Sequence, residues 1–441
     1  MKLEFILIIF FINFVYANDD NSGDSDDSTW ILTSSIVIFS MQSGFALLES
    51  GIVSKKNTIN IMMKNLADVL FGGIVYYFIG YNLIFGSDDN GFIGFGNFID
   101  ESEIDRNSGW YYSKYFFHLS FCTTATTIVS GALAERCKFS AYIIFSLFNT
   151  ILYCIPARWV FNNNGWLKQL GVVDFASAGP VHILGGCSGI VGALMLKPRI
   201  EKTRNSSLTN IMFGCFLLWF GWLSFNTGST FGITENKWIL ATKSACNTIN
   251  ASIGGGLLGY LYSYIYYKKF DVIIIVNSIL SSLVAITACC ANVDNYASII
   301  IGFISAYLSI ISNNKIKKIV DDPVGVFSTH CIGGVVGLIA AGLFTKHNFN
   351  DWNKIGLLYS GKFDLLLIQL LEIVSILSWS LIMSFIVFYC IDKSIGLRMS
   401  EEDEILGADI VYHIIDIEEN IVENDNRIHD INIVENERNN E

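Results

Sequence analysis

Two histidines in apolar surroundings are the residues of this chain most able to do chemistry. His182 lies in the run VDFASAGPVHILGGCSGIVGALM, eight residues after Asp174, and His330 follows Asp322 at the same spacing. Both stretches read D-x(7)-H-x-x-G-G-x-x-G. A titratable imidazole is costly in hydrocarbon, so it indicates a pore, a proton path or a ligand site. The alternative is a packed histidine that is hydrogen-bonded to a neighbouring helix.

A metal site is a weaker interpretation of the same pattern. Metal ions in proteins need three or four ligands, and the pattern offers no third candidate beside the two imidazoles. The ten cysteines include no CxxC pair and no Cys/His ligand spacing, so neither a zinc site nor a disulfide framework is indicated. No cofactor is expected. Nucleic-acid binding is not expected either, because no basic stripe occurs along the chain.

The composition is that of a membrane protein. Of the 441 residues, 52% are hydrophobic and only 15% are charged, with a mean hydropathy of +0.47. Soluble proteins carry about a quarter charged residues. Apolar runs of about 20 residues recur along the chain and predict an all-α integral membrane protein. The predicted fold has eleven transmembrane helices, at 30–54, 64–86, 110–134, 139–161, 175–197, 208–232, 239–266, 271–291, 296–312, 324–345 and 363–391.

The segments outside the membrane domain 30–391 have distinct compositions. Residues 1–17 have the pattern of a signal peptide, and 18–29 form an acidic N-terminus expected outside the cell. Residues 392–441 are expected to form a cytoplasmic tail whose distal part is disordered. Lysines and arginines gather in alternate loops, which places the N-terminus outside and the C-terminus inside.

The two histidine motifs also predict the internal symmetry of the fold. They fall in the fifth and tenth spans, so the two copies cross the bilayer in opposite directions. This is an inverted-topology repeat of five helices, and the interface of such repeats usually holds the translocation site. The glycines allow close helix packing. Asp322-Pro323 predicts an N-cap followed by proline at the first helical position, which favours a structural role for both aspartates.

Several motifs together resemble the ammonium transporter family. They are GFALLESGIVSKKNTINIMMKN (44–65), FHLSFCTTATTIVSGALAER (117–136), DFASAGPVHILGG (174–186), FGWLSFNTGS (220–229), DDPVGVFSTHCIGG (321–334) and GLRMSEEDEILGAD (396–409). The resemblance runs in order from about residue 30 to 413. The SKKN loop and the GLRMSEE stretch are more similar to ammonium transporters than to Rhesus proteins.

The resemblance implies a homotrimer in the cell membrane, with one pore per eleven-span subunit, and a transporter rather than an enzyme. Such a pore recruits ammonium, or its analogue methylammonium, at an outer aromatic vestibule, removes a proton, and passes ammonia between two histidines. By motif position, these roles fall on pore histidines His182 and His330, gate residues Phe121 and Phe225, recruiting residues Phe121, Phe161 and Ser229, pore-lining Trp222, and supporting residues Asp174 and Asp322. An ammonium sensor that signals through its tail is the alternative function.

Elementary physics agrees with these implied roles. Aromatic faces attract a small cation, and an apolar gate disfavours the charged form of the substrate. Paired imidazoles can alternately donate and accept, so a proton or a small polar molecule can move along them.

Three residues depart from the family pattern. In ARWVFNNNGWL, Phe161 stands where the family has a vestibule tryptophan, and Arg158 replaces a histidine. Phenylalanine has the weaker cation-binding face, which should weaken recruitment. His118 replaces a glutamine one turn before Phe121, on the same helix face. If vestibule water reaches it, His118 titrates near its ordinary pKa and should reduce uptake as the external pH falls through about 6 to 7.

Overall fold

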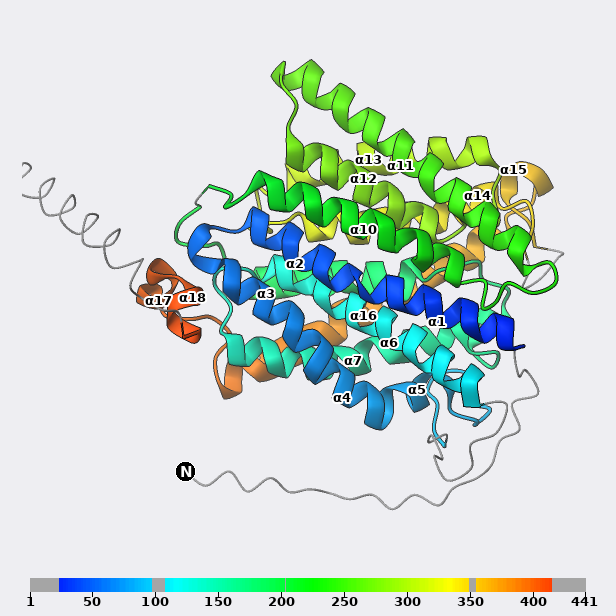
Figure 1. Cartoon of the computed structure of the whole chain (residues 1–441), viewed down its shortest axis with the longest axis horizontal. Helices are drawn as coiled ribbons and strands as arrows, with labels where there is room; N and C mark the ends of the chain where they lie inside the picture. The colour runs from blue at the N-terminus through cyan, green and yellow to red at the C-terminus, as the bar shows by residue number, and fades with distance from the viewer. Residues whose placement is uncertain (1–23, 97–107, 203, 349–353, 415–441) are drawn as a thin grey trace, which may run out of the picture.

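The computed structural model describes residues 24–96, 108–202, 204–348 and 354–414 as one bundle of helices (Figure 1). No strand occurs in these ranges, apart from an isolated bridge between Cys137 and Arg398. Each predicted span coincides with a helical segment, so the predicted all-α membrane fold is confirmed. The proposed signal peptide, residues 18–23 of the acidic N-terminus and the distal tail lie outside the described residues.

The first half of the bundle contains the first five spans. Their elements are α1 (Ser25–Phe39) with α2 (Met41–Ile52), then η1 (Lys55–Asn57), α3 (Thr58–Ala67), η2 (Asp68–Gly72), α4 (Gly73–Val75), η3 (Tyr76–Gly80) and α5 (Tyr81–Phe85), then α6 (Ser108–Ala132), α7 (Phe139–Phe161) with the short α8 (Trp166–Gln169), and η4 (Ala178–Ile183) with α9 (Leu184–Leu196).

The second half contains the next five spans and is followed by the eleventh. Its elements are α10 (Leu208–Gly228), α11 (Lys237–Tyr267), α12 (Val272–Thr287), α13 (Asn295–Ile316), η5 (Phe327–Cys331) with α14 (Ile332–Phe344), the short α15 (Leu357–Ser360) and the final span α16 (Asp364–Ser394). Two short helices, α17 (Glu401–Leu406) and α18 (Ala408–Tyr412), follow it. The segments η2, η3, η4 and η5 are π-helical turns.

Within the described ranges, eight helical segments are long and apolar enough to cross a membrane, and α12 is a shorter apolar helix. The remaining two spans, α6 and α11, are long helices that carry more polar residues. Large apolar side chains such as Leu257, Tyr264 and Phe303 are exposed on the outer surface of the bundle, as they must be where a helix faces lipid. The chain is a multi-pass membrane protein.

The two repeats cross at the histidine motifs. A side chain at Gly186 would lie 2.5 Å from the backbone nitrogen of Cys331, and one at Gly334 would lie 2.7 Å from the Ile183 side chain. One glycine of each motif therefore packs against the π-helical turn of the other repeat. Glycine allows this approach because it has no Cβ atom. The same contact brings the sulfur atoms of Cys187 and Cys331 to 3.4 Å.

Each motif aspartate binds the backbone of the turn that follows it. The Asp174 carboxylate accepts hydrogen bonds from the backbone N–H groups of Ala178 (2.6 Å) and Gly179 (2.8 Å). Asp322 accepts from Gly325 and Phe327, both at 3.0 Å. The expectation for Pro323 was wrong: the helix begins only after Gly325, so Pro323 lies in the preceding loop.

The third residue after each motif aspartate has a left-handed backbone. Ser177 has a φ of 69° and Gly325 a φ of 81°. This conformation lets the chain turn back so that the aspartate reaches the helix start. Glycine adopts it freely, whereas a residue with a Cβ atom is strained. Both repeats therefore contain the same turn, but its backbone is strained at Ser177 and unstrained at Gly325.

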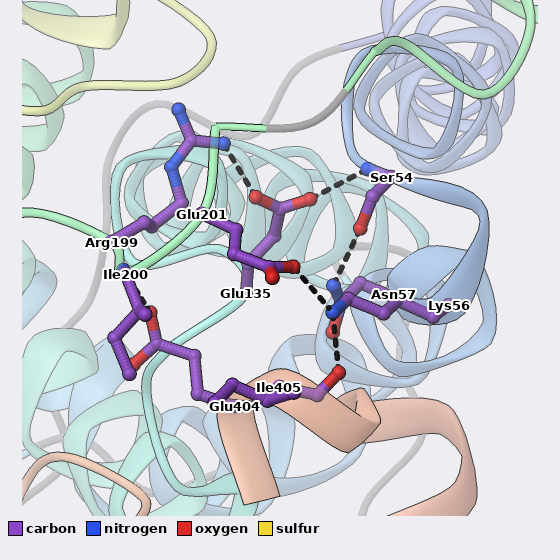
Figure 2. A pocket seen from close by; sticks show the side chains of 9 residues that line it. All are labelled: Ser54, Lys56, Asn57, Glu135, Arg199, Ile200, Glu201, Glu404 and Ile405. Atoms are coloured by element: carbon purple, nitrogen blue, oxygen red, sulfur yellow. Dashed lines mark hydrogen bonds and ion pairs between the residues drawn. The ribbon is translucent and has the colours of Figure 1, made fainter. Parts of the chain in front are cut away.

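The proximal tail docks on one end of the bundle, which we call the tail face (Figure 1). Asp409 accepts hydrogen bonds from the backbone N–H groups of Ile59 (3.0 Å) and Asn60 (2.6 Å) and so caps α3. The second span begins near Lys55, whereas the sequence predicted a start at residue 64. The cap could not be predicted because Asp409 lies 350 residues from Ile59 in the chain. Glu404 accepts from the Ile200 backbone N–H at 2.8 Å. Figure 2 shows Glu404 and Ile405 facing Glu135 and Lys56 across a small pocket.

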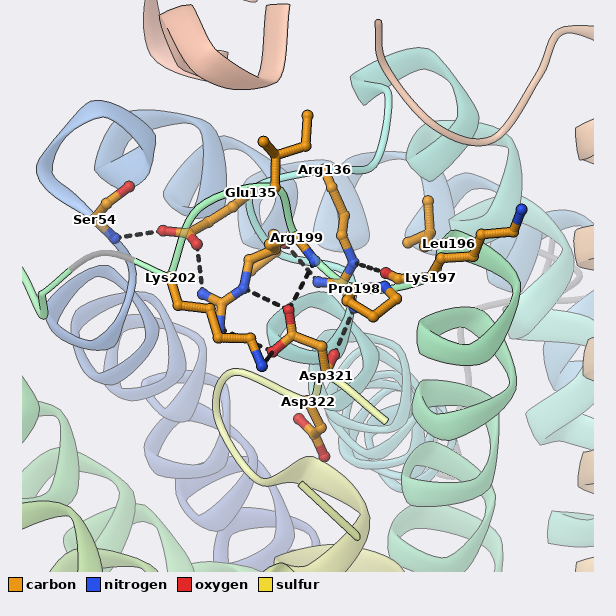
Figure 3. Close-up of polar contacts among 12 residues, drawn as sticks. Ser54, Glu135, Arg136, Leu196, Lys197, Pro198, Arg199, Lys202, Asp321 and Asp322 are labelled. Atoms are coloured by element: carbon orange, nitrogen blue, oxygen red, sulfur yellow. Dashed lines mark hydrogen bonds and ion pairs between the residues drawn. The ribbon is translucent and has the colours of Figure 1, made fainter. Parts of the chain in front are cut away.

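An ion cluster joins the two repeats on the tail face (Figure 3). Arg199 donates to the carboxylates of Glu135 (2.5 Å) and Asp321 (2.9 Å). Arg136 donates to the Asp321 backbone carbonyl at 2.6 Å. Burial alone would raise the pKa of Asp321, but the hydrogen bonds and charge of Arg199 lower it to about 2. The cluster therefore holds Asp321 as a carboxylate.

Candidate functional site

The two motif histidines meet in the centre of the bundle. Their Nδ1 atoms lie 3.2 Å apart, and their rings are nearly parallel, with centroids 5.4 Å apart. We call them the histidine pair. Both lie in π-helical turns, which are frequent at functional sites. His182 is fully buried and His330 is 5% exposed. A contact between two Nδ1 atoms requires one to donate and the other to accept, so the two rings hold different tautomers.

Trp222 fixes the orientation of one of these rings. Its indole stacks on His182 at a centroid distance of 5.1 Å and an interplanar angle of 13°. The indole N–H donates to the Thr287 hydroxyl at 2.8 Å, so its edge is satisfied while its face lies against the imidazole. The structure thus brings Trp222 from α10 to the histidine pair, beside the residues to which the sequence motifs assign it.

Two phenylalanines stack on one side of the histidine pair. The Phe121 and Phe225 rings are 3.9 Å apart at an angle of 9°, and both are fully buried. We call them the phenylalanine pair. Phe225 lies 5.7 Å from the His182 ring, centroid to centroid. Rings from α6, α10, η4 and η5 therefore form a continuous column, and no polar side-chain atom belongs to its phenylalanine part.

The residues expected beyond the phenylalanine pair also adjoin it. Phe161 meets Phe121 edge to face at 6.2 Å. The Ser229 hydroxyl donates to the backbone carbonyl of Phe225 at 2.8 Å. Because that bond uses the hydroxyl hydrogen, the Ser229 oxygen keeps only lone pairs to offer, so it can accept from an N–H group. Asp174 and Asp322 lie at the starts of their turns and not in the ring column.

His118 is not accessible to water as the sequence interpretation required. Its side chain is 0% exposed, and neither ring nitrogen has a hydrogen-bond partner within the part of the chain that the structure describes. The rings of Phe85 (4.6 Å), Phe161 (5.0 Å) and Phe231 (5.4 Å) pack around it. The expected exposure was wrong because helix periodicity gives the face of a residue and says nothing of the side chains that cover that face.

Arg158 has a structural position. Its fully buried guanidinium donates to the backbone carbonyls of Ile84, Gly86, Asp88 and Asn90, and to the Asp88 carboxylate at 2.8 Å. The side chain therefore ties the loop after α5 to the end of α7. Its charge is satisfied by the loop, and it does not reach the ring column.

Several buried charged residues escaped the sequence interpretation. Glu49, Lys64 and Asp68 are each at most 1% exposed, although they belong to segments that cross the bundle. Ionisable residues inside apolar spans are a recognised signal of function, and that signal was present in GFALLESGIVSKKNTINIMMKNLAD. Among the described residues, no three His, Cys, Asp or Glu side chains gather closely enough to hold a metal ion.

The arrangement combines an apolar barrier with a polar relay. A charged solute loses its hydration at the phenylalanine pair, whereas a small neutral molecule passes at lower cost. Beyond the barrier, the histidine pair offers one donor and one acceptor in line, and exchange of tautomers moves a proton without moving a ring.

Comparison with known proteins agrees with these observations. Residues 29–416 match the model of the Ammonium Transporter Family. A relative from Caenorhabditis elegans is 40% identical over 88% of this chain, which spans 60% of that longer protein. Ammonium transporter Amt2 of Archaeoglobus fulgidus is 34% identical, covering 88% of this chain and 87% of its own. The solved structure of a Sensor Amt Protein superposes with a TM-score of 0.81 at 31% identity, covering 88% of this chain and 98% of its own.

Proposed function

The chain belongs to the ammonium transporter family, and from that premise we propose that it moves ammonium across a membrane by separating it into ammonia and a proton. Ammonium is recruited beside Phe121, Phe161 and Ser229, loses its proton, and passes the phenylalanine pair as neutral ammonia. His182 and His330 then conduct ammonia and relay the proton. Trp222 orients His182, while Asp174 and Asp322 hold the two turns.

The observation that carries this proposal is the order of the ring column. A stacked phenylalanine pair adjoins a histidine pair whose Nδ1 atoms are 3.2 Å apart, and all four rings are at least 95% buried. Burial disfavours passage of the intact cation, since desolvating a charge costs many kilocalories. The two tautomers in turn give the separated proton a route that does not require water.

The same proposal includes the orientation and the assembly. The tail docks beside loops that contain Lys55, Lys56, Arg136, Lys138 and Arg199, and positive loops favour the cytoplasmic side. The tail face is therefore cytoplasmic and the Phe161 side is extracellular, in the cell membrane. The family resemblance supports a homotrimer, which mass determination of the detergent-solubilised protein would test.

The direct experiment is uptake of labelled methylammonium by yeast that lacks its own ammonium transporters. The full chain should support uptake that excess ammonium inhibits. A chain that reaches the membrane but supports neither methylammonium uptake nor growth on low ammonium would contradict the proposal.

Ammonium sensing is the second candidate, because one of the similar solved structures is that of a Sensor Amt Protein. In this chain a sensor would signal through the docked tail, whose Asp409 caps α3. A sensor and a transporter differ in turnover: a sensor binds ammonium without continued uptake, so the yeast assay separates the two functions.

A further inference from the structure

A buried carboxylate lies on the tail side of the histidine pair. Glu49, in α2, is 1% exposed. It lines a cavity together with His330, and the cavity has room for about one molecule of the size of water or ammonia. Thr329 and Asn277 supply other polar groups of the wall, and Phe45 and Leu280 supply apolar ones. We call this space the tail-side cavity.

The Glu49 carboxylate is fixed by two donors from other helices. Its Oε2 atom accepts from the Ser130 hydroxyl at 2.5 Å and from the Asn65 side-chain amide at 2.9 Å. The orientation of that amide is determined, because its oxygen accepts from the Thr127 hydroxyl at 3.0 Å. Two hydrogen bonds to one oxygen stabilise the ionised carboxylate, and they hold it against the cavity wall.

A cation also acts on this carboxylate. Lys64 lies on α3, and its charge interacts with Glu49. The Lys64 amine is fully buried and has no hydrogen-bond partner in the described part of the chain, and it lies 5.4 Å from the centre of the Tyr142 ring. Asp68, Cys137 and Arg136 are further titratable or charged groups that act on Lys64. Lys64 is therefore a second buried ionisable group that acts on Glu49, and it forms no hydrogen bond with Glu49 among the described residues.

We infer that Glu49 is the proton acceptor at the tail-side end of the histidine pair. This inference rests on the proposed function. A proton that reaches the histidine pair is relayed by His182 and His330. It crosses the tail-side cavity through one small molecule to the Glu49 carboxylate, which becomes a carboxylic acid. Ammonia that reaches the cavity takes this proton, so ammonium leaves intact and Glu49 returns to its carboxylate form. One proton accompanies each ammonia, and the cycle is balanced.

The test compares two fluxes in liposomes that contain the full-length protein. One is the current evoked by an ammonium gradient, which requires the proton. The other is the internal alkalinisation caused by an ammonia gradient at high pH, which does not. Glu49→Gln should lower the current at least about tenfold and leave the ammonia flux near that of the unaltered protein. Glu49→Asp keeps a carboxylate and should restore part of the current.

Asp68→Asn is the matched control, since it also changes a buried carboxylate to an amide. Asp68 accepts from the Tyr142 hydroxyl at 2.7 Å and does not line the tail-side cavity. Because Asp68 forms no hydrogen bond with Glu49 among the described residues, this variant should keep most of its ratio of current to ammonia flux. A Glu49→Gln current equal to that of the unaltered protein would overturn the inference. So would an equal loss of both fluxes in the Glu49 and Asp68 variants, which would mean a purely structural role. If the unaltered protein conducts neither, the proposed function itself fails.

Discussion

His182 and His330 touch through their Nδ1 atoms, 3.2 Å apart, although 148 residues of sequence separate them. One residue comes from each repeat, so the contact exists only because two chain segments of opposite direction cross at their π-helical turns. The proposed relay needs both rings, since a single imidazole would have no partner with which to exchange a proton.

Replacement of either histidine should therefore abolish proton-coupled transport. For His182→Ala and His330→Ala we expect ammonium-evoked currents to fall at least about tenfold, with each variant still reaching the membrane. The measurement is current per molecule in liposomes, normalised to protein content. Full currents in either variant would show that the proton takes another route.

A stronger aromatic face at position 161 should improve recruitment. Phe161 contacts both Phe121 and His118, and tryptophan binds cations better than phenylalanine does. Phe161→Trp should lower the half-saturating ammonium concentration by about two- to fivefold, equivalent to about 0.5–1 kcal/mol. Concentration series of uptake in yeast would measure it, with Phe92→Trp, on a neighbouring loop, as the control that should not change.

The burial of His118 reverses the pH prediction made from the sequence. Because phenylalanines separate the ring from water, external pH between about 6 and 7.5 should not change its charge. We expect the uptake profile of His118→Phe to run parallel to that of the unaltered protein across this range. Removal of two unpaired buried nitrogens should also raise thermal stability by about 1 kcal/mol. A decline of uptake below pH 7 that the variant lacks would show that water reaches the imidazole.

The left-handed turns of the two repeats offer a reciprocal pair of substitutions. Ser177 has a φ of 69° and its buried hydroxyl lacks a partner among the described residues. Ser177→Gly should stabilise the protein by about 1 kcal/mol. Gly325→Ser, the matched change in the other repeat, should destabilise it by a similar amount. Thermal unfolding of both variants in detergent tests this, and shifts of the same sign would refute the argument from strain.

The ion cluster around Asp321 should make the free energy of unfolding depend on pH. The pKa of Asp321 is lowered to about 2 from an ordinary 3.8, so its contribution is complete above pH 4 and is lost as the pH falls towards 2. Allowing for solvent screening, this contribution is about 1–2 kcal/mol. Asp321→Asn should be less stable than the unaltered protein at pH 7, and the difference should shrink to about a third of that value at pH 2.5. A difference at pH 2.5 as large as that at pH 7 would assign the effect to packing.

Much of this architecture could be predicted from the sequence, because apolar runs and repeated motifs are local patterns. The spans, the inverted repeat and the pairing of His182 with His330 follow from such patterns. The cover over His118 and the loop that binds Arg158 could not be predicted, since both depend on which segments pack together in three dimensions. Asp409 shows the same limit, because it caps a helix 350 residues earlier in the chain.

The sequence did contain a signal for Glu49, which stands out as a charge in an apolar span. The sequence could not predict that Glu49 and His330 line the same cavity, because residues from several helices enclose that space. The ring column was predictable only through family resemblance, because a phenylalanine in a membrane helix is ordinarily a packing residue. The site roles assigned to the column stay predictions until the variants above are measured.

The docked tail has a practical consequence for anyone who shortens or labels this protein. Its side chains bind mainly main-chain atoms of the loops: Asp409 binds N–H groups at the start of α3, and Arg398 donates to the Leu196 and Pro198 carbonyls. Substitution of a loop side chain leaves these main-chain partners in place. A stop codon before Arg398, in contrast, removes all the tail side chains that bind them. An affinity tag is therefore best kept clear of Arg398 and Asp409, because a tag there would displace the side chains that hold the tail on the bundle.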